Sequence, residues 1–209
     1  MPAVTVLQLD TSFPRIPGDV ACPQTYLGEV EVIRIAQASV AQVVSDRPDL
    51  IDIAPFEDAV RRAKGDVIVT SCGFLSYWQD QLAALADRPF VASALIGLKR
   101  LDNPTVLTFD AASLTPLHLR GAACRVVGLS DDMHLKQVIR GGLPHLDVTQ
   151  VATEMTKLEL PADTKHLLLE CTNLPPYKHV FRKLLDVPIT DILTEIERLK
   201  AGTIDPAFL

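Results

Sequence analysis

The chain has 209 residues, of which 48% are hydrophobic and 22% are charged. This composition is typical of a soluble globular protein, and the length suits one domain or two small lobes that share a core. The 20 basic and 26 acidic residues give a net charge of −6. Nucleic-acid binding needs basic side chains gathered in a stripe or patch, so this balance argues against a nucleic-acid partner.

The amino terminus, MPAVTVLQLD, has no basic region followed by a long apolar core, and no apolar stretch of the chain is long enough to span a membrane. We therefore expect a cytoplasmic protein with no membrane partner. The 4 cysteines form no CxxC pair, and no pair of Cys or His residues has the spacing of metal ligands. We expect free thiols and no metal site.

Apolar runs of strand length alternate with segments of helical pattern, an order typical of a mainly parallel α/β sheet. We predict strands at Val4–Leu9, Val30–Ile35, Val67–Thr70, Phe90–Ser93, Thr105–Phe109, Arg125–Leu129 and His166–Leu169. We predict helices at Phe56–Lys64, Phe74–Ala86, Met133–Ile139, Val148–Lys157, Tyr177–Leu185 and Ile192–Lys200. The Pro- and Gly-rich segment Thr11–Thr25 follows the first strand, and a loop of this length at a strand end is typically functional.

Similar strands recur about 100 residues apart, which indicates an internal repeat. VLQLD at Val6–Asp10 and VLTFD at Val106–Asp110 both end in Asp. DVIVTSC at Asp66–Cys72 and KHLLLEC at Lys165–Cys171 both end in Cys. The repeat predicts two related lobes, each of which presents an Asp-ended strand and a Cys-ended strand.

The predicted fold class is therefore α/β, with two pseudosymmetric three-layer lobes, mainly parallel sheets and an active site in the cleft between the lobes. The first lobe is expected to comprise residues 1–95 and 188–209, and the second residues 96–187.

The two strand-end cysteines, Cys72 and Cys171, are the main candidates for catalysis. An approximate twofold axis between the lobes would bring them to one ligand from opposite sides. Inversion of a carbon next to a carboxylate needs a base on one face and an acid on the other, and a thiol serves as either when nearby donors lower its pKa. Asp10, at the end of the first strand, is expected to orient or deprotonate a thiol.

Polar side chains near the strand ends are expected to bind the carboxylate of the substrate. The hydroxyl donors expected there are those of Thr70, Ser71, Ser113 and Thr172. Arg15, in the first loop, either clamps the carboxylate or lies in solvent. Gly73 would let a ligand approach the backbone closely, and Phe74 would add an apolar wall. If the strand alternation persists, the side chain of Glu170 points away from that of Cys171.

The sequence resembles the cofactor-independent aspartate/glutamate racemase superfamily, which also includes hydantoin racemases, maleate isomerases and arylmalonate decarboxylases. The resemblance covers nearly the whole chain. It rests on Asp10 and Thr11 after the first strand, on TSCGF at Thr70–Phe74 and on ECTN at Glu170–Asn173. Asn173 itself departs from the pattern, because several members have an imidazole or an acid there.

The resemblance implies two pseudosymmetric α/β lobes with one catalytic cysteine from each, Cys72 and Cys171. It places Asp10, Thr70 and Thr172 at substrate or support positions. We also expect Thr11 and Asn173 to contact the substrate. The resemblance further implies a small carboxylate as substrate, no cofactor, and the ability to form a homodimer.

From these observations we expect a cofactor-independent racemase or epimerase of a small amino acid or related carboxylate, with the two cysteines as opposed bases. Two alternatives remain open at this point. One is a maleate-type cis–trans isomerase in which a cysteine adds to a double bond as a nucleophile. The other is a small-molecule binding protein built on a racemase scaffold.

Overall fold

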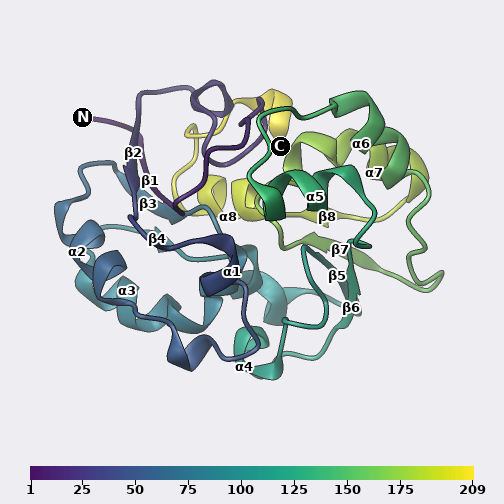
Figure 1. The fold of residues 1–209 in the computed structure, drawn as a ribbon, viewed down its shortest axis with the longest axis horizontal. Coiled ribbons are helices and arrows are strands. Elements are labelled where there is room, and N and C mark those ends of the chain that lie inside the picture. The colour runs from purple at the N-terminus through teal and green to yellow at the C-terminus, as the bar shows by residue number, and fades with distance from the viewer.

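The computed structural model describes all residues, 1–209. They form two sheets of four parallel strands that lie side by side, each flanked by helices (Figure 1). The first sheet contains β1 (Val4–Gln8), β2 (Val30–Arg34), β3 (Val67–Thr70) and β4 (Phe90–Val91). The second sheet contains β5 (Pro104–Thr108), β6 (Arg125–Gly128), β7 (His166–Leu169) and β8 (Ile189–Thr190).

The two sheets have the same topology. Their strand orders are β2-β1-β3-β4 and β6-β5-β7-β8, so the first strand of each repeat lies between the next two strands of the same repeat. In the first sheet Val4 pairs with both Val30 and Val67, and in the second Thr105 pairs with both Arg125 and Leu167. The predicted two-lobed α/β fold with an internal repeat is therefore confirmed.

Eight α-helices connect and cover the strands. They are α1 (Val40–Val43), α2 (Ala54–Arg62), α3 (Gln79–Leu85), α4 (Pro116–Leu119), α5 (His134–Gly141), α6 (Val148–Met155), α7 (Lys178–Leu184) and α8 (Ile192–Leu199). Two longer 3₁₀ helices are η3 (Gly73–Trp78) and η4 (Ala94–Arg100), and four shorter ones are η1 (Pro23–Thr25), η2 (Pro48–Leu50), η5 (Pro175–Tyr177) and η6 (Pro206–Phe208).

All seven predicted strands and all six predicted helices are present, with differences mainly at their ends. The helix predicted over 74–86 is a 3₁₀ helix followed by α3, and the strand predicted over 90–93 shortens to two residues. The sequence reading missed β8, a strand of two residues directly after Pro188. The pairing of β8 with β7 puts residues 189–190 in the second sheet, and the proposed lobe boundaries stay a prediction.

Alternate side chains of the first sheet enter two different cores. Val4 and Val6 of β1 pack in a cluster that includes Ile192 and Ile196 of α8. Leu7, on the opposite face of β1, belongs to a larger cluster that extends into the second sheet. The first sheet is thus covered on one face by α8, and the cluster on its other face includes residues of α2 and α3 and extends into the second lobe.

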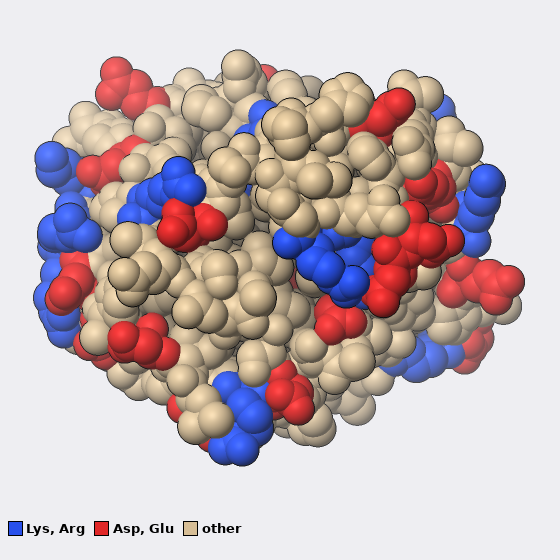
Figure 2. Space-filling view, viewed as in Figure 1, with Lys and Arg blue, Asp and Glu red and all other residues tan.

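The charged side chains on the face shown in Figure 2 are mixed in sign, with acidic groups beside most of the basic ones and a largely uncharged centre. None of the helices combines the length and the apolar character that crossing a membrane would require.

A buried ion pair fixes the carboxyl-terminal part of the chain. The ammonium of Lys178, at the start of α7, lies 2.7 Å from the carboxylate of Asp191, and both side chains are nearly inaccessible. Asp191 also caps α8 by accepting a hydrogen bond from the backbone N–H of Thr194. Lys178 in turn donates to the carbonyl of Phe208 at 2.7 Å. The pair therefore joins α7, α8 and the carboxyl terminus.

Replacement of Lys178 by Met should lower the free energy of unfolding by about 3–5 kcal/mol, because it leaves the carboxylate of Asp191 buried without its cation. Urea unfolding measures this change. The control is Lys165→Met, which removes an exposed pair with Asp102 and should leave the unfolding midpoint unchanged. A similar midpoint for the Lys178 variant and the wild type would show that the buried pair does not hold the helices together.

Candidate active site

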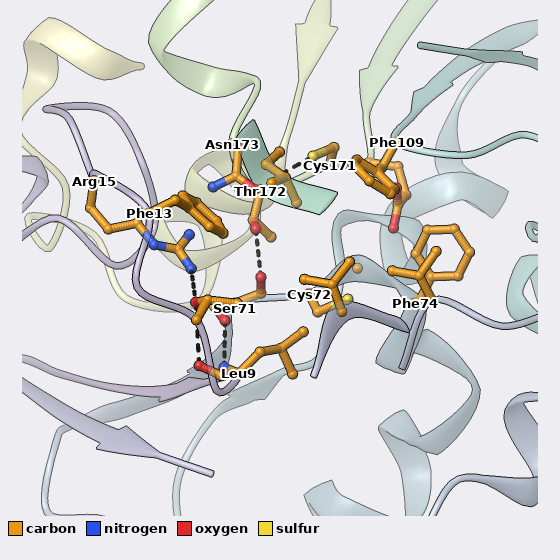
Figure 3. A pocket seen from close by; sticks show the side chains of 16 residues that line it. Leu9, Phe13, Arg15, Ser71, Cys72, Phe74, Phe109, Cys171, Thr172 and Asn173 are labelled. Atoms are coloured by element: carbon orange, nitrogen blue, oxygen red, sulfur yellow. Dashed lines mark hydrogen bonds between the residues drawn. The ribbon is translucent and has the colours of Figure 1, made fainter. Parts of the chain in front are cut away.

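A cavity lies at the carboxyl ends of β3 and β7, where the two sheets meet (Figure 3). Its lining residues are Leu9, Thr11, Phe13, Arg15, Val40, Val44, Ser71, Cys72, Gly73, Phe74, Phe109, Ile139, Glu170, Cys171, Thr172 and Asn173. The volume of this cavity is about 30 Å³, which restricts the site to small ligands. Its position at strand ends is the one that open α/β sheets use for ligands.

The two strand-end cysteines face this cavity together. Cys72 follows β3 and Cys171 follows β7, and both are buried. Figure 3 shows the sulfur of Cys171 on one side of the cavity and that of Cys72 on the other. The backbone N–H of Phe74 has a lowering effect on the pKa of Cys72, and that of Asn173 has the same effect on the pKa of Cys171. The predicted juxtaposition of the two thiols around one cavity is therefore present.

The two strand ends touch directly. The hydroxyl of Thr172 donates a hydrogen bond to the carbonyl of Ser71 at 2.8 Å. A Cβ atom at Gly73 would lie 2.0 Å from Oε1 of Glu170 and 2.6 Å from its carbonyl oxygen. Only glycine fits at position 73 in this arrangement. The sequence reading attributed Gly73 to the approach of a ligand, whereas the structure shows that it makes room for Glu170.

Glu170 lines the cavity, whereas a continued strand alternation would have directed its side chain away from that of Cys171. Its carboxyl group lines the same cavity as the thiol of Cys171, because β7 ends at Leu169 and the strand alternation stops there. Oε2 accepts a hydrogen bond from the hydroxyl of Thr108 at 2.7 Å, while Oε1 is buried and has no partner. Burial raises the pKa of Glu170 to about 7, although hydrogen bonds from Thr108 and the backbone of Phe109 lower it in part.

Both thiols are harder to ionise than a free cysteine. Burial, and then the charge of Glu170, raise the pKa of Cys72 to about 12, against the lowering effects of the Phe74 N–H and of Arg15. Burial and Glu170 also raise the pKa of Cys171, and the nearby thiolate of Cys72 raises it further. Both thiols are therefore protonated at neutral pH.

Arg15 provides the positive charge of the cavity. Its Nη1 lies 3.2 Å from both carboxylate oxygens of Asp19, and Nη2 donates to the hydroxyl of Thr11 at 2.9 Å. The guanidinium lies 4.1 Å from the centre of the Phe13 ring. Its Nε is buried and has no partner. The alternative of a solvated loop arginine is therefore wrong, because the side chain is only 12% exposed.

Asn173 links the second cysteine to the first loop. Its Oδ1 lies 3.7 Å from the sulfur of Cys171, in position to accept the thiol hydrogen. Its Nδ2 donates to the carboxylate of Asp19. Asp19 thus accepts hydrogen bonds from both Arg15 and Asn173. The sequence reading missed this role of Asp19. The only signal was its position four residues after Arg15, in a loop already expected to be functional.

Three residues of the predicted site lie outside the cavity, and their predicted roles need correction. The carboxylate of Asp10 accepts hydrogen bonds from Nε of Arg34 and the N–H of Gln37, and is directed away from the thiols. The hydroxyl of Thr70 donates to the carbonyl of Ala92 at 2.6 Å, which joins β3 to the segment after β4. The hydroxyl of Ser113 donates to Asp110 at 2.6 Å. Each of these polar groups is satisfied by its own lobe.

The remaining lining residues that the sequence reading missed are mostly apolar. They are Leu9, Phe13, Val40, Val44, Phe109 and Ile139. Leu9 and Phe109 occupy equivalent places after β1 and β5, so the internal repeat contained the signal for both. No group of three or more His, Cys, Asp or Glu side chains is arranged to hold a metal ion.

Replacement of Gly73 by Ala should lower the free energy of unfolding by about 1–3 kcal/mol, because the new methyl group would overlap the backbone and carboxylate of Glu170. Chemical denaturation measures the loss. Gly141→Ala is the control, since a Cβ there would meet only the side chain of Leu143 at 3.3 Å. If both variants unfold at the wild-type midpoint, the contact between the strand ends is looser than the structure indicates.

Glu170 should make the stability of the protein depend on pH. Its pKa is raised in the folded state, so the folded protein binds the proton more tightly than the unfolded chain. Relative to Glu170→Gln, the wild type should lose about 3 kcal/mol of unfolding free energy as the pH rises from 4.5 to 8, most of it below pH 7. The comparison needs urea unfolding of both proteins across this range. A constant difference between them would contradict a raised pKa, and Glu159→Gln, at an exposed position, should follow the wild type.

No protein-family model matches the chain, but curated relatives match it over nearly its whole length. Dimethylsulfoniopropionate lyase 5 from Emiliania huxleyi (strain CCMP1516) is 29% identical over 99% of this chain and 47% of its own length. A dimethylsulfoniopropionate lyase from Durusdinium sp. clade D is 24% identical over 96% of this chain and 74% of its own. The chain thus spans about half the length of the first of these relatives.

Solved structures share the fold at lower sequence identity. Unliganded arylmalonate decarboxylase superimposes with a TM-score of 0.54 at 14% identity and covers 98% of this chain and 96% of its own. Allantoin racemase from Klebsiella pneumoniae gives a TM-score of 0.56 at 14% identity over 95% of this chain and 88% of its own. Glutamate racemase from Francisella tularensis subsp. tularensis SCHU S4, in complex with D-glutamate, gives 0.52 at 15% over 93% and 77%.

These findings correct the expected activity. The relatives by sequence are lyases, so the expectation of a racemase or epimerase, with its isomerase and binding-protein alternatives, is wrong. The chain has the two-lobed fold of these decarboxylase and racemase structures, and its curated relatives by sequence are enzymes.

Proposed function

We propose that the chain is a lyase that cleaves dimethylsulfoniopropionate into dimethylsulfide and acrylate. The observation that carries this proposal is the match to dimethylsulfoniopropionate lyases over 96–99% of the chain. The cavity described above supports it, because the three chemical parts of the substrate correspond to three kinds of lining group.

The substrate has a carboxylate, an acidic C–H next to it and a sulfonium group on the following carbon. A base removes the proton at C2, and the electrons of that bond form the C2–C3 double bond. The C3–S bond breaks with its electron pair, so the sulfur leaves as neutral dimethylsulfide and the base keeps the proton. The reaction needs one base, a partner for the carboxylate and a lining that accepts the dimethylsulfonium group.

The cavity presents these features in the corresponding order. Figure 3 shows Arg15 on one side, Phe74 and Phe109 on the other, and the two thiols between them. The partnerless Nε of Arg15 suits a carboxylate. Aromatic faces attract a cation. The substrate carbon that loses its proton would then lie between the sulfurs of Cys72 and Cys171.

The electrostatics favour Cys72 as the base. Arg15 lowers the pKa of Cys72, whereas Asp19 and the thiolate of Cys72 raise that of Cys171. Cys171 also directs its hydrogen to Asn173. A sulfonium cation in the cavity stabilises a thiolate by opposite charge, so the substrate itself promotes ionisation of its base. Elimination returns no proton to the opposite face of C2, so Cys171 is not required as an acid. It then only lines the cavity with a polar side chain.

Purified protein should release dimethylsulfide and acrylate in equal amounts from dimethylsulfoniopropionate, as measured by gas chromatography and liquid chromatography. Cys72→Ser should lower kcat/KM at least ~100-fold, the usual contribution of a general base, and Cys171→Ser should lower it less. Cys124→Ser, half-buried outside the cavity, is the control and should match the wild type. The absence of both products with the wild-type protein would refute the proposed lyase activity. A Cys72→Ser variant with full activity would refute only the assignment of the base.

A further inference from the structure

Glu170 carries a free acceptor inside the cavity that the elimination just described does not use. Glu170 is 1% exposed, and its Oε2 accepts a hydrogen bond from the hydroxyl of Thr108. Oε1 is buried, has no hydrogen-bond partner and lies on the side of Gly73. A buried carboxylate oxygen without a partner is costly unless a ligand completes its environment.

The surroundings of Glu170 suit a cation better than a hydrogen-bond donor. Its carboxyl group contacts Gly73 and Thr108, which precede Phe74 and Phe109 in the chain. Both phenylalanine side chains line the cavity, and Figure 3 shows them on the side opposite Arg15. Aromatic rings combined with one carboxylate recognise onium groups, which carry a positive charge but no N–H or O–H.

The nearby cations of the protein are already paired elsewhere. Arg15 lies with Asp19, and the ammonium of Lys136, 5.6 Å from the Phe109 ring, pairs with Asp110 and Asp131. Burial, and then the charge of Glu170, raise the pKa of the thiols of Cys72 and Cys171, which can add only negative charge. The ring of His118 packs 5.1 Å from that of Phe74, but burial lowers the pKa of His118 to about 4, so it is neutral at pH 7. An ionised Glu170 therefore lacks a positive partner of its own.

We propose that the free carboxylate oxygen of Glu170, together with Phe74 and Phe109, forms the subsite for the onium group of the substrate. This inference rests on the proposed function for the identity of that group as a sulfonium. The subsite also distinguishes the substrate from the product, because the sulfonium becomes a neutral thioether when the C–S bond breaks. The attraction to Glu170 ends at that moment, which favours release of dimethylsulfide.

The subsite should discriminate by charge, and the pKa of Glu170 near 7 makes that discrimination depend on pH. Below this value the carboxyl group is neutral, and above it the group is anionic. The preference for a cationic ligand over a neutral ligand of the same shape should therefore increase as the pH rises through 7. Binding of the cation itself lowers the pKa of Glu170.

The test compares dimethylsulfoniopropionate with 4-methylpentanoate, in which a neutral C–H replaces the charged sulfur. The inhibition constant of 4-methylpentanoate is compared with the KM of dimethylsulfoniopropionate, or with its Kd if it is bound without cleavage. In Glu170→Gln, affinity for the cation should fall at least ~10-fold relative to the neutral ligand. Glu170→Asp, which keeps the charge, should restore most of the preference. Glu195→Gln alters another buried glutamate that is paired with Arg100 and should not change the preference.

The outcomes separate the two proposals. If the wild type cleaves the substrate but Glu170→Gln weakens both ligands equally, the lyase proposal stands and the onium subsite is refuted. If no cleavage occurs, trimethylsulfonium is titrated while the carboxyl signal of Glu170 is followed by ¹³C NMR. A lowered pKa of Glu170 in its presence would support the subsite without the lyase activity. An unchanged pKa would refute the subsite.

Discussion

The packing of Gly73 against Glu170 is the contact on which the site depends. Nothing larger than a hydrogen atom fits at position 73, because a Cβ there would come within 2.0 Å of the Glu170 carboxylate. The end of β3 can therefore approach the end of β7 closely enough for Thr172 to donate to the carbonyl of Ser71. Each thiol follows directly on one of these strand ends, so the same contact that joins the lobes determines how far apart the two sulfurs lie.

This close approach has an electrostatic consequence. It removes Cys72, Cys171 and Glu170 from water together, and burial raises the pKa of all three. Both thiols are therefore protonated at neutral pH, and Arg15, which is paired with Asp19, lowers the pKa of Cys72 only in part. Glu170 ionises most readily of the three buried acids, and its negative charge raises the pKa of both thiols. Under the proposed lyase activity, the positive charge of the substrate would relieve this mutual opposition and so promote formation of a thiolate.

The sequence was most informative where its repeat was strict. The Cys-ended strands predicted both the paired lobes and the thiols that share a cavity, because equivalent ends of two similar parallel sheets face each other. The same logic failed for Asp10, which follows a strand end yet turns to Arg34. A local partner decides the direction of such a side chain, and that partner comes from a neighbouring strand. The direction of Glu170 could not be predicted by strand alternation, because β7 ends one residue before it. The steric requirement for glycine at position 73 comes from Glu170 of the other lobe, so the sequence around Gly73 does not reveal it.

The same fold accommodates decarboxylases, racemases and relatives that are lyases, and the chemistry of the leaving group explains how the lyase differs. All three reactions build negative charge on a carbon next to a carboxylate. A racemase returns a proton to that carbon from the opposite face. An elimination disposes of the charge within the substrate, since the electrons move into a double bond and expel the neighbouring group. What an elimination site needs in addition is therefore recognition of the leaving group. In this cavity the additional features are Phe74, Phe109 and a buried glutamate, at the end opposite Arg15, and they suit a leaving group that arrives as a cation and departs without charge.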